Sequence, residues 1–411
     1  MSEVHRLVDE SQMRPVQRVE FTTLSPMQFQ TEIDDITAQL TDWRRDFHQH
    51  PELGYEETRT AKLVAERLTS FGLEVHTGLG VTGVVGTLKG NGGAGPTLGL
   101  RADMDALPMT EETGAAHASS TSGVFHGCGH DGHTTMLLGA AQALSRRPDF
   151  AGTVHFIFQP AEEGLAGAKA MMKDGLFERF PCDEVYGMHN WPQVPLGKIA
   201  LRSGPVMAAS DRVEIEIEGV GAHAAMPHKG IDPVYVASQV ISGLQSLVSR
   251  SLDPQDAAVV SITTMEGGSA TNVIPRTAKL AGTCRTFLPE TRDRMEAGIE
   301  RIATHTATAH GATAKVTFTR GYPPTVNHAE QVQLATEACA AVVGEESLIH
   351  DAAPSMGGED FAFMLESVPG CYIWLGAGGD YDVHHPRYDF NDRVIPLGVG
   401  YWTELVMSRL G

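Results

Sequence analysis

The order of predicted strands and helices between residues 205 and 318 constrains the fold more than any other feature. Apolar residues alternate strictly with charged ones near 213–218, which is typical of a strand with one face in water. The β-α-β-β-α-β order of this region is that of a ferredoxin-like α+β unit. The predicted elements span 211–218, 233–251, 258–266, 278–287, 289–311 and 314–320. Because the unit is complete in itself, we predict that residues 205–318 form an inserted domain.

The segments on either side of the insertion follow a different pattern. Buried strands alternate with helices before it, as in 153–158, 166–173 and 184–188. This alternation predicts an α/β class, with a three-layer α/β/α domain built on a largely parallel sheet. The predicted division of the chain is an N-terminal arm (1–28), a first part of the α/β domain (29–204), the insertion (205–318) and a second part of the α/β domain (319–411).

Length and composition narrow the class of protein. A chain of 411 residues is too long for one ordinary core, so more than one domain is expected. The net charge of -20 argues against nucleic acid and anionic membranes as partners. The five cysteines are odd in number and scattered, which favours a reducing compartment. With neither a secretory signal nor a membrane-spanning run in this sequence, we expect a cytoplasmic protein.

A glycine-rich stretch at 127–133 carries one thiol and two imidazoles. In an extended segment the side chains of Cys128 and His130 would point the same way. A thiolate and an imidazole that converge form half of a transition-metal site, most naturally for zinc or manganese. The alternative is that Cys128 is a small buried apolar residue and the histidines are polar surface groups.

Carboxylates follow two of the predicted strands. Asp103 and Asp105 come after the strand 98–102, at the end where α/β sheets place their ligands. We interpret them as partners that orient a histidine ligand, with a turn cap as the alternative. Glu162 and Glu163 follow the strand 153–158; in extended backbone one would bind metal while the other faces a substrate. The alternative for this pair is a solvated acidic turn.

Two further segments supply histidines, at His189 and at His384/His385. With these, the motifs of the chain resemble those of the M20 metallopeptidase family. Within that family the chain is most similar to the amidohydrolase branch of hippurate hydrolases, N-acyl-amino-acid amidohydrolases and auxin-conjugate hydrolases. The resemblance covers the chain from about His48 to its end. The motifs that carry it lie at 48–53, 101–108, 128–133, 159–163, 221–227, 272–275, 356–361 and 384–386.

This resemblance implies a metal centre and a reaction. It implies that five residues bind a pair of divalent ions, zinc or manganese, with the cysteine as the bridge. These residues are Cys128, His130, Glu163, His189 and His384. Glu162 is then the general base that acts on a metal-activated water. The resemblance favours His384 over His385 because the family's histidine stands two positions before the proline.

The resemblance also gives the inserted domain a role as lid and dimerisation domain. It implies that His223 stabilises the oxyanion of the partner subunit in a homodimer, and that Asn272 and Arg285 hold the substrate carboxylate. Two structural alternatives remain open. Asn272 would then cap a turn, and Arg285 would pair with a neighbouring strand.

The predicted function is that of a metal-dependent amidohydrolase acting on small N-acyl-amino acids, such as hippurate-like or N-acetylated substrates. A carboxypeptidase or dipeptidase acting on free peptides is the nearest alternative. A non-catalytic acyl-amino-acid binding protein is less favoured, because a pure binder has no use for a general base. A zinc deaminase is disfavoured because its Pro-Cys-x-x-Cys motif is absent from this sequence.

Overall fold

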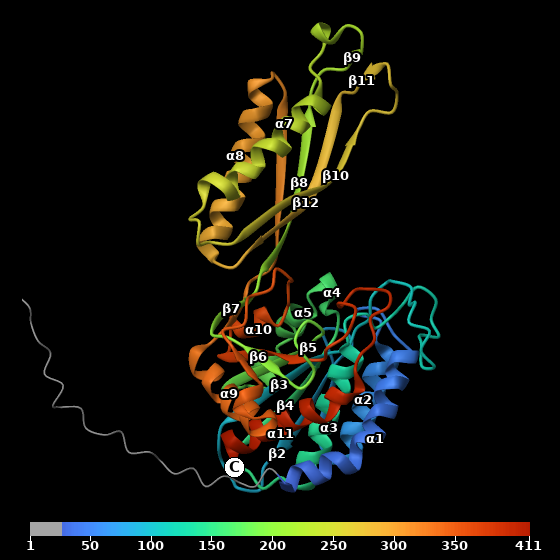
Figure 1. Cartoon of the computed structure of the whole chain (residues 1–411), viewed down its shortest axis with the longest axis vertical. Coiled ribbons are helices and arrows are strands. Elements are labelled where there is room, and N and C mark those ends of the chain that lie inside the picture. The colour runs from blue at the N-terminus through green and yellow to red at the C-terminus, as the bar shows by residue number, and fades with distance from the viewer. Residues whose placement is uncertain (1–26) are drawn as a thin grey trace, which may run out of the picture.

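The computed structural model describes residues 27–411, and side chains from residue 30 onward. The predicted arm, 1–28, lies outside the described residues except for its last two, which begin the first helix. Figure 1 shows two bodies, a large one below and a slender inserted one above. They are joined by two crossing segments, which are the two stretches of chain that pass from one body to the other. Each body is built on its own sheet, of eight and four strands respectively. The predicted α/β class is confirmed.

The large sheet is mixed in direction. Its strands lie in the order β1-β2-β4-β3-β5-β16-β6-β15. The central strands β4, β3, β5 and β16 are parallel, whereas β1 and β2 form an antiparallel hairpin at one edge. Strand β2 also pairs antiparallel with β4, and β6 with β16, so the sheet is less parallel than predicted. The strand bounds are Glu74–Leu79 (β1), Gly83–Lys89 (β2), Thr97–Asp103 (β3), Thr153–Gln159 (β4), Glu184–Trp191 (β5), Ile199–Leu201 (β6), Leu348–His350 (β15) and Gly370–Gly376 (β16).

Helices cover both faces of the large sheet and give it three layers. On strand β16, Ile373 and Leu375 pack in one apolar core, while Tyr372 and Trp374 pack in the other. The first core holds Met27–Gln49 (α1), Thr58–Ser70 (α2), His130–Arg146 (α3), Ala329–Val343 (α9) and Ile395–Leu410 (α11). The second core includes residues of the short helices Gly167–Lys173 (α5), Leu176–Arg179 (α6) and Ala362–Leu365 (α10). The four-residue helix Glu162–Leu165 (α4) comes directly before α5.

The inserted body runs from β8 to β13 and has the predicted ferredoxin-like order. Its four strands lie in the order β10-β12-β8-β13, and every neighbouring pair is antiparallel. Its core is formed by the apolar face of the sheet and two helices, α7 and α8. The bounds are Ala209–Glu218 (β8), Pro233–Ser246 (α7), Ala258–Gly267 (β10), Thr277–Thr286 (β12), Pro289–Ala309 (α8) and Thr313–Tyr322 (β13).

Short elements complete both bodies. A ribbon of Ala222–His223 (β9) and Val273–Ile274 (β11) lies at the tip of the inserted body, far from the large sheet (Figure 1). At the junction, Gly204–Met207 (β7) pairs with Thr325–Asn327 (β14). Tighter or wider helical turns occur at Pro227–Lys229 (η2), Leu247–Ser251 (η3), Glu345–Ser347 (η4) and Asp392–Val394 (η5). Among the described helices, none has both the length and the apolar character needed to cross a membrane.

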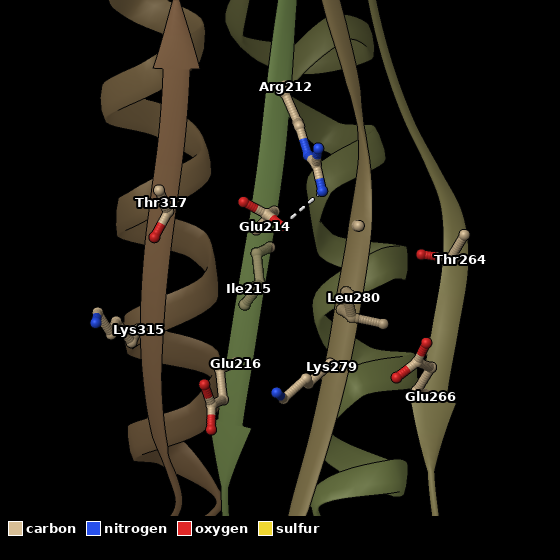
Figure 2. A pocket seen from close by; sticks show the side chains of 11 residues that line it. Arg212, Glu214, Ile215, Glu216, Thr264, Glu266, Lys279, Leu280, Lys315 and Thr317 are labelled. Atoms are coloured by element: carbon tan, nitrogen blue, oxygen red, sulfur yellow. Dashed lines mark hydrogen bonds and ion pairs between the residues drawn. The ribbon is translucent and has the colours of Figure 1, made fainter.

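The other face of the inserted sheet carries charged side chains. Figure 2 shows Glu216 of β8 in register with Lys279 of β12 and Lys315 of β13. Opposite charges on neighbouring strands stabilise a sheet by about 0.2–1 kcal/mol per pair. A hollow of about 440 Å³ lies on this face. All groups of three metal-ligand side chains found in residues 27–411 lie in the large body, so the chemistry is sought there.

Candidate metal centre

Side chains from four distant segments meet beside the carboxyl ends of the central strands. Cys128 Sγ lies 3.3 Å from His189 Nε2, and His384 Nε2 lies 3.1 Å from Glu163 Oε1. His130 Nε2 lies 4.0 Å from the same glutamate oxygen. Ligand atoms fall within 4.8 Å of one another in three groups: Cys128–His130–His189, Cys128–Glu163–His384 and His130–Glu162–Glu163. The structure thus gathers one thiol, three imidazoles and two carboxylates around one space.

A glycine in the left-handed region brings Cys128 and His130 together. Helix α3 begins at His130, and Gly129 before it has φ +94°. A Cβ at Gly129 would also collide with the side chain of Asn190. The expectation of an extended segment is therefore wrong, because the chain turns sharply at Gly129 to enter the helix. The thiol and the imidazole still converge, through this turn and not through strand alternation.

The two glutamates also lie on a turn and not on extended backbone. Ala161 has φ +53°, and Glu162 opens the four-residue helix α4. The Asp105 carboxylate accepts hydrogen bonds from the backbone N–H groups of Glu162 (3.0 Å) and Glu163 (2.9 Å), which is what bends the chain here. The side chains nevertheless separate. Glu163 contacts His384, whereas Glu162 Oε1 accepts a hydrogen bond from the backbone N–H of Asp360 (3.3 Å).

Unsatisfied polar atoms show that these residues fit a cation. Both ring nitrogens of His130 and Oε1 of Glu163 are buried and form no well-aligned hydrogen bond within the described residues, although charged groups lie 3.1–4.0 Å from them. A buried polar atom without a partner costs about 1–3 kcal/mol, so such atoms signal a bound group. Sulfur, imidazole nitrogen and carboxylate oxygen together are the donor set of zinc and similar divalent ions.

The local electrostatics favour positive charge at the same place. Burial and the neighbouring Glu163 and Glu162 raise the pKa of the Cys128 thiol well above its usual value. Burial lowers the pKa of the His130 imidazole, but Asp103 and other carboxylates outweigh burial and raise it to about 10. The thiol is held neutral and the imidazole charged because the site is rich in negative groups. Divalent cations would reverse both states by compensating those carboxylates.

Asp103 and Asp105 both face histidines, as expected of orienting partners. Asp105 Oδ1 lies 3.3 Å from His130 Nδ1. Asp103 Oδ1 lies 2.6 Å from His133 Nδ1, and its other oxygen lies 3.8 Å from His130 Nε2. The nearest partner of Asp103 is thus His133, which sequence reasoning placed in the glycine-rich stretch but gave no role.

Sequence reasoning missed a buried charge network beneath Glu162. The guanidinium of Arg101 donates to Asp103 (2.8 Å), Glu359 (3.0 Å) and Asp360 (3.1 Å), and all four side chains are buried. One cation therefore offsets three carboxylates next to the glutamate turn. The available signal was that Arg101, Glu359 and Asp360 lie in the motifs 101–108 and 356–361 that carry the family resemblance.

The structure places His384 and His385 differently. His384 has φ +65° and turns its Nε2 toward Glu163. His385 instead stacks on Tyr381, with ring centroids 4.4 Å apart, and its Nδ1 accepts a hydrogen bond from the backbone N–H of Arg387 (3.1 Å). Of the two imidazoles, that of His384 is the one that reaches the ligand cluster.

The structure does not bring His223 and Asn272 to the metal centre. His223 is exposed in β9. Asn272 lies close to His223, since the backbone carbonyl of Asn272 accepts a hydrogen bond from the backbone N–H of Ala224 (3.0 Å). Strand β8, which has 10 residues, separates this tip from the large body by roughly 30 Å. Neither side chain therefore reaches the ligand cluster of its own chain.

Arg285 lies at the opposite end of the inserted sheet, on the side of the large body. It is in register with Ser210 of β8 and Val259 of β10. Its guanidinium donates to the carbonyl of Cys284 (3.1 Å) and to the hydroxyl of Thr283, both on its own strand. Burial lowers the pKa of this guanidinium. In this arrangement Arg285 has no carboxylate partner among the described residues, and its pairing is local.

Comparison with known proteins agrees with this geometry. The model of peptidase family M20/M25/M40 matches residues 99–408. The hippurate hydrolase of Campylobacter jejuni is 43% identical over 92% of this chain and 98% of that relative. The N-acetylcysteine deacetylase of Bacillus subtilis is 40% identical over 91% of this chain and 97% of that relative.

A solved structure gives the same result. The YxeP protein of Bacillus subtilis, described as a dinuclear metal-binding peptidase from the M20 family, superposes with a TM-score of 0.81. It is 38% identical, and the match covers 91% of this chain and 98% of that one. Family match, relatives and the gathered ligand side chains lead to one conclusion: the chain belongs to peptidase family M20/M25/M40 and is a metal-dependent hydrolase of amide bonds.

Proposed function

We propose that this protein hydrolyses the amide bond of small N-acyl-amino acids, of the hippurate or N-acetyl type. The observation that carries the proposal is that four ligand-type side chains meet in one place: Cys128, Glu163, His189 and His384. Glu162 lies beside them, and we take it as the base because it is not part of the Cys128–Glu163–His384 group. Relatives named hippurate hydrolase and N-acetylcysteine deacetylase, at 43% and 40% identity, support the substrate class.

The proposed metal content is two divalent ions per subunit, zinc or manganese. The proposed ligands are Cys128, which belongs to two of the ligand groups, together with His130, Glu163, His189 and His384. Bound there, the ions would supply Lewis-acid chemistry, which polarises a carbonyl and lowers the pKa of water. The thiolate favours zinc, while the carboxylate-rich surroundings also accept manganese.

The proposed role of Glu162 is to move the proton. Its carboxylate takes a proton from the attacking water and returns it to the leaving amine, which turns a poor leaving group into a good one. Burial, together with Glu359 and Glu163, raises the pKa of Glu162 well above its usual value. Such a carboxylate holds a proton more readily than a solvated one does, and this suits a group that must carry it between two steps.

The inserted body supplies the remaining proposed groups. Arg285 and Asn272 bind the carboxylate of the substrate, for which a guanidinium fork is well shaped. His223 donates a hydrogen bond to the oxyanion in the partner subunit of a homodimer formed through the inserted bodies. Two observations support the dimer. His223 lies too far from its own metal centre, and the tip exposes the apolar side chains of Val220, Met226 and Val273.

A substrate panel tests this function. N-benzoylglycine, N-acetyl-amino acids and free dipeptides are offered to one metal-analysed preparation, and release of the free amino acid is measured. We expect hydrolysis of the acylated amino acids at least ten times faster than that of dipeptides. The opposite ranking would favour a carboxypeptidase or dipeptidase, which the peptidase description of the YxeP relative keeps as a second candidate. Full activity of metal-stripped protein would refute the metal's role.

A further inference from the structure

Tyr322 connects the inserted body to the turn that carries both glutamates. It is the last residue of β13, where the chain leaves the inserted body. Its hydroxyl donates a hydrogen bond to the backbone carbonyl of Glu162 (2.5 Å) and accepts one from the backbone N–H of Ala166 (3.1 Å). A tyrosine hydroxyl can donate and accept at once, so one oxygen serves both bonds.

These two hydrogen bonds of the Tyr322 hydroxyl take the place of one backbone hydrogen bond of a regular helix. In a regular α-helix the N–H of Ala166 would bond directly to the carbonyl of Glu162, four residues earlier. The Tyr322 hydroxyl stands between these two groups, so the turn is open. The backbone angles agree, because Glu163 has ψ 77°, Gly164 has φ 79° and Ala166 is left-handed. The hydroxyl therefore sets how far the glutamate turn departs from a helix.

The main chain of Tyr322 is fixed to the inserted body. The buried pair Asp211–Arg292 closes this end of its sheet, with Arg292 Nε 2.9 Å from Asp211 Oδ2. Asp211 also accepts a hydrogen bond from the backbone N–H of Gly321 (3.1 Å), and Arg292 donates to the carbonyl of Tyr322 (3.4 Å). Since these contacts bind the end of β13 on both sides, Tyr322 follows any rotation of the inserted body.

The other supports of the turn come from the large body. Asp105 accepts the N–H groups of Glu162 and Glu163, Asp360 accepts that of Ala168 (2.9 Å), and the Tyr55 hydroxyl donates to the carbonyl of Leu165 (2.9 Å). Within residues 27–411, the hydrogen bonds of Tyr322 are the ones that reach this turn from the inserted body.

We propose that Tyr322 is a positioning residue that couples the orientation of the inserted body to the placement of Glu162 and Glu163. When the inserted body has the orientation seen here, the hydroxyl holds the turn open and both carboxylates face the ligand cluster. A rotation about the two crossing segments withdraws the hydroxyl, and the turn is then free to relax. The inference rests on the proposed function in that it takes Glu162 as the base.

Two tyrosine variants provide a matched test in the full-length, metal-loaded protein. Tyr322→Phe removes the hydroxyl between Glu162 and Ala166, while Tyr55→Phe removes a hydroxyl from the same turn without touching the inserted body. Hydrogen exchange is measured over peptides covering 161–168. We expect exchange there to rise roughly 3- to 10-fold in Tyr322→Phe, because the amide of Ala166 loses its acceptor. In Tyr55→Phe it should stay unchanged, because the Tyr55 hydroxyl donates to a carbonyl and no amide of the turn depends on it as an acceptor.

Kinetics give the second measurement. For Tyr322→Phe we expect kcat to fall about 3- to 10-fold with KM within twofold and metal content unchanged, because the loss affects carboxylate placement and not substrate binding. Tyr55→Phe is expected to keep kcat. Unchanged exchange at 161–168, or an equal rise across the whole inserted body, would overturn the proposal. If the wild type fails to hydrolyse any acyl-amino acid, the proposed function fails, and the exchange comparison still decides the role of Tyr322.

Discussion

Asp105 Oδ1 lies 3.3 Å from His130 Nδ1, with both side chains buried under the candidate metal centre. The same carboxylate accepts the backbone N–H groups of Glu162 and Glu163, which are more than 50 residues away along the chain. One side chain thus holds the start of helix α3 and the glutamate turn in a fixed relation. The spacing of the ligand atoms depends on this contact.

Asp105→Asn should weaken metal binding. The amide keeps the size of the side chain but lacks the charge that receives two backbone N–H groups, so both His130 and the turn lose their anchor. We expect roughly 10- to 100-fold lower metal affinity, the range found when partners of metal ligands are changed. Competition with a fluorescent chelator measures it. Asp380→Asn, on an exposed loop, is the control and should bind metal as the wild type does.

The two glutamates should respond differently to the same change. Glu162→Gln should retain metal and lose roughly 10²- to 10⁴-fold in kcat, because it removes the proton carrier and leaves the ligands in place. Glu163→Gln should lose metal, since an amide is a poorer ligand than a carboxylate. Metal analysis beside kcat separates the two. Metal loss in Glu162→Gln alone would mean that the two roles are exchanged.

Removal of metal should be reversible and should change stability. A chelator is expected to abolish hydrolysis, and zinc or manganese to restore it, whereas magnesium should not, because it prefers sites made of oxygen alone. At 100 times the dissociation constant, the returning ion should add about 2.7 kcal/mol to the free energy of unfolding. Thermal unfolding with and without added metal measures this gain. An unchanged Tm would contradict the buried ligand cluster.

Mixing two inactive variants tests the proposed role of His223. Cys128→Ala should destroy the metal centre of its own subunit, and His223→Ala should disable the centre of its partner. After mixed refolding, half of the dimers pair one variant with the other, and one of their two centres is complete. About a quarter of wild-type activity should therefore return, as expected for a symmetric dimer. If His223→Ala retains activity by itself, or the mixture stays inactive, the shared site is wrong.

Acid should destabilise the protein through Glu111. Burial opposes its ionisation, but hydrogen bonds from His48, the backbone N–H of Ser119 and Thr113 outweigh burial and lower the pKa of Glu111 to about 2 from the usual 4.5. A lowered carboxylate pKa stabilises the fold above about pH 4.5, and that stability is lost as pH falls toward 2.

Glu111→Gln should remove this dependence. We expect a difference in unfolding free energy on the order of 1 kcal/mol at pH 7, shrinking through the window from about pH 4.5 to about 2. Urea unfolding of metal-stripped protein at several pH values measures it. Glu112→Gln, at the exposed neighbouring position, is the control. A gap that stays constant with pH would contradict the lowered pKa.

Elements with a clear period could be predicted from the sequence. The sequence over 395–410 predicts a closing helix, which is α11 (Ile395–Leu410), and the four predicted strands of the insertion match β8, β10, β12 and β13 to within two residues at each end. The apolar period over 134–146 predicts a helix, and α3 begins four residues before it. The period misses these residues because 130–133 are buried yet include no apolar side chain that would extend it. Some strands have only two or three residues and form through pairing with partners distant in sequence, so no local sequence pattern predicts them. These are β6, β9, β11 and β15.

For the site, residue types and their positions at strand ends indicate which segments meet, but not the backbone conformation that brings them together. The ligand-type side chains gather as expected, although His189 lies within β5 and not after it. Their individual roles stay predictions. The contacts of Arg101 with Glu359 and of Tyr322 with Glu162 join segments separated by 258 and 160 residues. Such pairs follow from the packed fold, which a linear pattern does not contain.

The position of β16 affects how this chain folds during synthesis. β16 (Gly370–Gly376) lies between β5 and β6 in the large sheet, whereas all four strands of the inserted sheet come from residues 209–322. During synthesis, all strands of the inserted sheet therefore emerge from the ribosome before β16, the strand that joins the two parts of the large sheet. Until the last segment emerges, β5 has an unpaired edge, which is an opening for misfolding and aggregation. Chains that terminate early, before residue 370, would retain that edge.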